Sequence, residues 1–169
     1  MVDKTTNWDY KNPMALIQKL LDDHAFFRQY LDRLHEAAQT LPTGASLPAS
    51  QNGTDEFTYR LRRHARIENE VLFPALQRAG TADDRIKNVS TFLDHGKDEH
   101  ASVAKRHAEM KTSTEEQALD TDWRKFMGRF SNGLLTHMQK EEEEIFPLAQ
   151  ALLGQDRLTE LSQKANDIP

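Results

Sequence analysis

Four stretches of this chain place apolar residues three and four positions apart, and this spacing limits the fold more than any other feature. Such spacing gives an α-helix a single apolar face. The stretches cover roughly residues 13–40, 54–80, 81–111 and 121–154. No segment alternates apolar and polar residues over a useful length, so we expect no strands. Long helices joined by short connections predict an all-α, up-down-up-down four-helix bundle.

Glycine and proline mark the expected ends of these helices. Asn12 and Pro13 are suited to the cap and first turn of the first helix. Gly80 and Gly154 are expected to end the second and fourth helices. The sequence therefore predicts a single domain over residues 1–169, with a short N-terminal arm and a short C-terminal helix over residues 156–165.

Every apolar stripe is interrupted by a histidine, and two stripes also contain a glutamate. The interrupting residues are His24, His64, Glu68, His100, His137 and Glu141. In both pairs, the glutamate follows the histidine by four residues, which places both side chains on one helical face. If the four histidines share one layer of an antiparallel bundle, the two glutamates fall together in the layer one turn away.

The two glutamates belong to a repeated motif. Residues 64–74 read HARIENEVLFP and residues 137–147 read HMQKEEEEIFP, so both motifs end in Phe-Pro. An ionised glutamate in a dry interior costs several kcal/mol unless something pairs with it or coordinates it. The stripes contain no inward lysine or arginine, so the pattern predicts a metal site. Histidine with carboxylate suits a pair of first-row ions, with iron expected, and leaves coordination positions for a small ligand.

Other readings of the same residues remain open at this point. A polar structural network would also use buried histidines and glutamates. A haem held by two histidines would leave the glutamates without a role, and a structural zinc site would require closed tetrahedral ligand sets. A ferritin-like oxidase is a poorer match, because no histidine follows a glutamate by three residues.

Several neighbouring residues are interpreted as lying outside the site. His35 lies away from the stripe, His95 is turned away from it, and His107 lies about two turns beyond His100. Glu142 and Glu143 are expected to face solvent. The matched positions of the Phe-Pro pairs predict a shared bend after each motif.

Composition excludes several classes of function. The net charge is −5, without a basic stripe, so neither nucleic acid nor an anionic membrane is expected as a partner. No apolar run is long enough to span a membrane. The chain has no cysteine, which removes disulfides and thiolate ligands. The first ten residues, MVDKTTNWDY, lack the apolar core of a secretion signal, so we expect a cytoplasmic protein.

The motifs resemble those of the hemerythrin-like (HHE cation-binding) family. The matching segments are LLDDHAFFRQYLDRL, HARIENEVLFPAL, DEHASVAKRH and HMQKEEEEIFPLA, and together they span most of the chain. The resemblance implies a four-helix bundle that holds two non-haem iron ions, bridged by carboxylates and by an oxo or hydroxo group. The iron ligands that it implies are His24, His64, Glu68, His100, His137 and Glu141.

Two departures from the oxygen-carrying hemerythrins affect the expected function. Those proteins have a second histidine one turn before the third-helix ligand, where this chain has Gly96. They commonly end the set with aspartate five residues after the last histidine, where this chain has Glu141 at four. The resemblance therefore points to the nitric-oxide-response and iron-sensing relatives, and to binding or sensing of dioxygen, nitric oxide or peroxide. The alternative is a di-iron enzyme, or an iron-handling protein of oxidative stress, that turns over peroxide or nitric oxide. Gly96 is expected to leave space beside the iron pair.

Overall fold

Helices make up almost all of the structure that positions the predicted site. The computed structural model describes residues 15–40, 51–80, 84–112 and 121–169. The elements are α1 (Ala15–Thr40), α2 (Gln51–Ile67), η1 (Glu68–Leu72), α3 (Phe73–Ala79), α4 (Asp84–Thr112), α6 (Thr121–Lys140), η2 (Glu141–Ile145) and α7 (Phe146–Asn166). Within these ranges there is no strand, so the prediction of an all-α bundle is confirmed. None of the helices described combines the length and the apolar character needed to cross a membrane.

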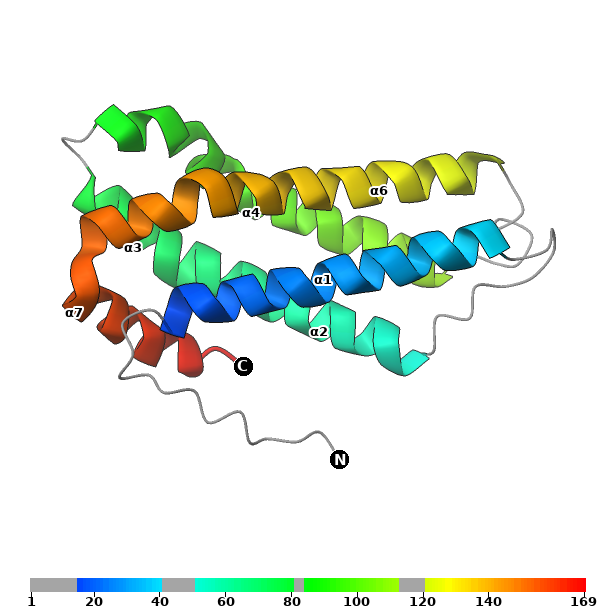
Figure 1. Ribbon diagram of the computed structural model, residues 1–169, viewed down its shortest axis with the longest axis horizontal. Helices are drawn as coiled ribbons and strands as arrows, with labels where there is room; N and C mark the ends of the chain where they lie inside the picture. Colours follow the sequence, from blue (N-terminus) through cyan, green and yellow to red (C-terminus); the bar gives the residue numbers. More distant parts are fainter. Residues whose placement is uncertain (1–14, 41–50, 81–83, 113–120) are drawn as a thin grey trace.

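Helices α1, α2, α4 and α6 lie side by side around the core (Figure 1). Helix α1 contacts α2 and α6, and α4 contacts the same two helices, so each long helix has two long neighbours. In Figure 1, α1 and α4 run toward one end of the molecule, whereas α2 and α6 return from it. Residues that lie at one level of the bundle therefore come from distant parts of the sequence.

The second and fourth predicted helices are each interrupted by one π-helical turn, which the sequence did not predict. Helix α2 continues through η1 into α3, and α6 continues through η2 into α7. At the end of these turns the Phe73 amide donates to the Glu68 carbonyl, and the Phe146 amide donates to the Glu141 carbonyl. Pro74 and Pro147 follow directly. Because proline has no amide hydrogen, it cannot donate the backbone hydrogen bond of a regular α-helix. The Phe-Pro pairs therefore mark a local irregularity, which is the wider π-helical turn just before each proline.

Two apolar clusters fill the core. The first, here called the Leu16 cluster, includes Leu16, Leu20, Leu72, Leu76, Ile145 and Leu161. The second, here called the Phe27 cluster, includes Phe27, Leu31, Phe57, Phe130, Leu134 and Met138. Along α1, the first cluster precedes His24 and the second follows it. The predicted polar layer therefore lies between two dry regions.

The C-terminal segment turns back against the first helix. Gly154 has a φ of 70°, a backbone conformation that suits glycine, and the helix continues beyond it to Asn166. This second part of α7 buries Leu158 and Leu161, and α7 contacts α1. Arg63 of α2 donates to the carbonyl of Ile168 at 3.0 Å. The predicted C-terminal helix is thus confirmed, whereas the predicted N-terminal arm lies outside the described residues.

Candidate metal centre

The six residues predicted as metal ligands are all buried and meet at one level of the bundle. Each long helix contributes one histidine, and each glutamate is the first residue of a π-helical turn. The side chains are His24 of α1, His64 of α2, Glu68 of η1, His100 of α4, His137 of α6 and Glu141 of η2. The most exposed of them, His137, retains only 7% of its accessible surface. Solvent is therefore largely excluded from the donor atoms.

These side chains form two overlapping groups. The His24 group consists of His24 and His64 with both glutamates, and the His100 group consists of His100 and His137 with the same two glutamates. Within each group, one donor atom from every residue lies within 4.8 Å of the others. The groups thus supply separate histidines and share their carboxylates.

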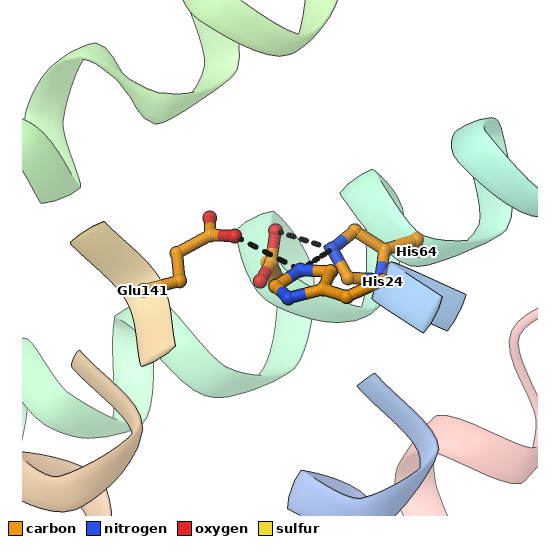
Figure 2. Close-up of side chains that lie close together, drawn as sticks. His24, His64 and Glu141 are labelled. Carbon is orange, nitrogen blue, oxygen red and sulfur yellow. Dashed lines mark hydrogen bonds and ion pairs between the residues drawn. The ribbon is translucent and has the colours of Figure 1, made fainter. Parts of the chain in front are cut away.

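The contacts of each glutamate reach both groups. Glu68 Oε2 lies 3.4 Å from Nε2 of His64 and 3.1 Å from Nε2 of His100. Glu141 places Oε1 2.8 Å from Nε2 of His137 and Oε2 3.2 Å from Nε2 of His24. Figure 2 shows His24, His64 and Glu141 pointing toward one another from different helices. This is the arrangement of two carboxylates that can bridge a pair of cations.

The carboxylate oxygens themselves show that the site suits a cation. Both oxygens of Glu68 and both oxygens of Glu141 are buried and have no hydrogen-bond partner. Buried carboxylate oxygens without partners are strongly disfavoured, because they have lost water without gaining a donor. A bound metal ion would supply the missing partner for both side chains, so the residues present fit the predicted group.

The electrostatics of the metal-free site reflect the same proximity. Burial would lower the pKa of His64, but the charge of Glu68 and the contacts with Asp23 and Glu68 raise it to about 10. Burial would raise the pKa of Glu68, but the charge of His64 and the contact with His100 hold it well below its usual value. Proton and metal therefore compete for the same donor atoms.

A second set of polar residues lies behind the histidines, and the sequence analysis did not identify it. The outer nitrogen of His24, Nδ1, lies 2.8 Å from Glu142 Oε1, and Arg28 donates to both oxygens of Glu142 at 2.8 and 2.9 Å. The outer nitrogen of His100 lies 3.2 Å from the amide nitrogen of Asn69. The expectation that Glu142 faces solvent is met only in part, because 28% of its side chain is exposed but its carboxylate contacts α1. Burial would raise the pKa of Glu142, but hydrogen bonds from Arg28 and His24 lower it.

One sequence signal for these residues was available. Asn69 and Glu142 occupy the same position of the repeated motif, directly after Glu68 and Glu141. A regular α-helix turns each residue by about 100°, so consecutive side chains seldom share a face. The wider π-helical turn brings both members of each pair toward the interior, and helical spacing alone does not reveal that turn.

Aromatic rings cover the histidines, so the site is enclosed by apolar groups. The ring-to-ring distances are 5.5 Å for His24 and Phe146, 5.4 Å for His64 and Phe27, 6.4 Å for His100 and Phe73, and 5.0 Å for His137 and Phe92. Two of these phenylalanines belong to the Phe-Pro pairs. The repeated motif therefore supplies a glutamate and, after the π-helical turn, the ring that covers a histidine on another helix.

The remaining predictions about the site have mixed outcomes. His35 and His95 are exposed and belong to neither group, whereas the side chain of His107 lies outside the described residues. Gly96 is buried, but it does not border open space. A Cβ atom at this position would lie 2.7 Å from Cε2 of Phe73. The expectation of space beside Gly96 is therefore wrong, and close packing against the Phe73 ring explains the glycine.

The sequence comparisons agree with this geometry. Comparison with curated proteins and with solved structures finds no match. The family model of the hemerythrin HHE cation-binding domain matches residues 15–149. This range includes both histidine groups and both π-helical turns. The chain therefore belongs to the hemerythrin HHE cation-binding domain family.

Proposed function

We propose that this protein holds two non-haem iron ions and uses them to bind or sense dioxygen, nitric oxide or peroxide. The observation that supports this proposal is the pair of histidine groups sharing Glu68 and Glu141. In the proposed centre, His24 and His64 would hold one ion, His100 and His137 would hold the other, and both glutamates would be available to each. Iron suits this mixture of imidazole and carboxylate ligands.

The protein residues provide the ligands, the charge and the dry surroundings of this centre. The two glutamates contribute two negative charges in a region that the Leu16 and Phe27 clusters keep apolar. Bound iron would supply redox chemistry and open coordination positions for a small ligand. Each ion would receive two histidines and shared carboxylates, which is fewer than the five or six ligands that iron usually takes.

The enclosed character of the site favours a small ligand over a larger substrate. Phenylalanine rings cover all four histidines, and the donor atoms lie in the interior of the bundle. Such surroundings admit a diatomic molecule or peroxide more readily than a larger substrate. The second candidate function, turnover of peroxide or nitric oxide in iron handling or oxidative stress, would use the same residues.

Anaerobic reconstitution with ferrous iron tests the proposal. The iron bound per chain is counted after gel filtration, and optical spectra are recorded after separate additions of air, hydrogen peroxide and nitric oxide. We expect two iron ions per chain and a spectral change that reverses when the gas is removed or the ligand is dialysed away. Continued consumption of peroxide or nitric oxide would support the enzyme instead.

A matched pair of variants links the result to the site. His137→Ala should lose iron while keeping its helical circular dichroism, and His95→Ala should behave as the native chain because His95 is exposed and belongs to neither group. Full iron content in His137→Ala would contradict the proposed centre.

A further inference from the structure

The outer nitrogens of two matched histidines meet chemically different partners. His24 Nδ1 lies 2.8 Å from a carboxylate oxygen of Glu142, whereas His100 Nδ1 lies 3.2 Å from the amide nitrogen Nδ2 of Asn69. A carboxylate can only accept a hydrogen bond, and the NH₂ group of asparagine can only donate one. The two partners therefore select opposite tautomers of the neutral imidazole ring.

His24 is held in the tautomer that can coordinate a metal ion. Its Nδ1 carries the proton and donates to Glu142, so the lone pair of Nε2 is free and faces the centre. Glu142 is itself fixed by Arg28, which donates to both of its oxygens. On the same side of the centre, a carboxylate oxygen of Asp23 lies 3.6 Å from Nδ1 of His64. Carboxylates thus face the outer nitrogens of both histidines in the His24 group.

His100 is held in the other tautomer. Because Asn69 Nδ2 donates to its Nδ1, the proton of the neutral ring is on Nε2, the atom that faces Glu68 and His137. The amide oxygen of Asn69 is buried and has no hydrogen-bond partner. Coordination through Nε2 requires His100 to move its proton to Nδ1 and Asn69 to turn its amide so that this oxygen accepts the proton.

We propose that the His24 group takes up the first metal ion and the His100 group the second, because Glu142 prepares His24 for coordination and Asn69 does not prepare His100. This inference rests on the proposed metal binding, but it concerns the order and strength of the two steps. A histidine that donates to a carboxylate is also a stronger metal ligand than one that donates to an amide. At His24 and His100, both effects act in the same direction.

Titration of the metal-free protein with Zn²⁺, monitored by ¹⁵N NMR of the histidine rings, tests the order directly. Zinc is diamagnetic and prefers the same imidazole and carboxylate donors. Long-range correlations report the tautomer of each ring, and single His→Gln variants assign the signals. Before zinc is added, we expect His24 to be protonated on Nδ1 and His100 on Nε2. During the first equivalent, the signals of His24 and His64 should shift while those of His100 remain.

Two isosteric substitutions exchange the chemistry of the partners. Glu142→Gln gives His24 an amide partner and should weaken the first binding step by about 10- to 100-fold. Asn69→Asp gives His100 a partner that can only accept a hydrogen bond, and it should strengthen binding of the second ion. The double variant should fill the His100 group first. Glu143→Gln is the control, because Glu143 is exposed on the same π-helical turn and accepts from Gln139.

The outcomes separate this inference from the proposed function. Absence of bound Zn²⁺ and Fe²⁺ would contradict metal binding itself. If two ions bind but the NMR signals of both histidine groups shift together, or the His100 signals of the native protein shift first, the proposed order of binding is overturned and metal binding itself is not. An unchanged order in a folded Asn69→Asp, Glu142→Gln double variant would also overturn it.

Discussion

At the scale of single residues, the two glutamates differ from the histidines because the two histidine groups share them. Each histidine belongs to one group, whereas Glu68 and Glu141 belong to both. Each glutamate also contacts one histidine from each group, at distances between 2.8 and 3.4 Å. In the proposed two-ion centre, loss of a glutamate should therefore affect both ions, whereas loss of a histidine should affect mainly one.

This difference gives the first prediction. We expect Glu68→Gln to lower retention of both ions, because a neutral amide bridges two cations poorly, and His100→Ala to lose mainly the ion of its own group. Metal content after gel filtration, measured by atomic emission, distinguishes the two patterns. Glu144→Gln is the control, since Glu144 is exposed. Equal loss in Glu68→Gln and His100→Ala would show that Glu68 does not bridge.

The second prediction concerns the pH dependence of the metal-free protein. The pKa of His64 is raised from 6.5 to about 10, so its stabilising contribution is complete below pH 6.5 and is lost as the pH rises through about 10. The pKa of Glu68 is lowered from 4.5, so its contribution is present above pH 4.5 and is lost at lower pH. Between pH 4.5 and pH 6.5, the stabilising contributions of His64 and Glu68 are both present.

Urea denaturation in the presence of a chelator measures this effect. The urea concentration at the unfolding midpoint of the native chain should decrease as the pH is raised from 6 to 9.5. In His64→Gln this decrease should be smaller. A native midpoint that is equal or higher at pH 9.5 would disprove the assigned role of His64.

At this scale, the sequence predicted the buried residues better than their partners. The histidines and glutamates were identifiable because they interrupt apolar stripes at helical spacing, and burial of a charge demands compensation. Glu142 and Asn69 were missed because their spacing places them off that stripe in a regular helix. Their contacts depend on η1, on η2 and on which helices cover those turns, which are tertiary features.

At the scale of elements, the π-helical turns explain why the repeated motif has its form. Each turn begins at a glutamate of the centre and ends before a Phe-Pro pair, so the extra width lies where two consecutive residues must both reach the interior. The sequence predicted helices over these segments and marked a bend at the prolines. It did not predict the turns, because the apolar spacing before and after them is that of an ordinary helix.

Packing between α4 and α3 gives the third prediction. Gly96→Val should destabilise the protein by about 1–3 kcal/mol, because the new side chain would collide with the Phe73 ring. Addition of Phe73→Leu should recover part of this loss. Chemical denaturation measures both effects.

Another glycine of the same fold provides a matched control. Gly133 also lies within a helix, but a Cβ atom there would meet nothing within 4 Å. Gly133→Val should therefore keep the stability of the native chain or raise it by up to about 0.5 kcal/mol. Similar effects at both glycines would mean that helix propensity, rather than the Phe73 contact, determines the result at Gly96.

At the scale of the whole molecule, the polar layer divides the core. The Leu16 and Phe27 clusters lie on either side of six residues that carry two buried carboxylates. Helices α1 and α4 pass through this layer, and α2 and α6 continue across it as η1 and η2, so the two halves of the core are joined by the backbone and by the side chains that meet at the centre. Without a cation, the four orphaned carboxylate oxygens weaken this junction.

The last prediction follows from this division. A metal ion that binds only the folded chain should raise the free energy of unfolding by about 2.7 kcal/mol at a free concentration of 100 times its Kd. Leu161→Ala, in the Leu16 cluster, should lower stability by about 2–5 kcal/mol but keep the gain from metal, because Leu161 lies outside the donor set. His137→Ala should lose much of that gain. Calorimetric scans with and without Zn²⁺ compare the three proteins, and an equal gain in all of them would show that zinc binds elsewhere on the chain.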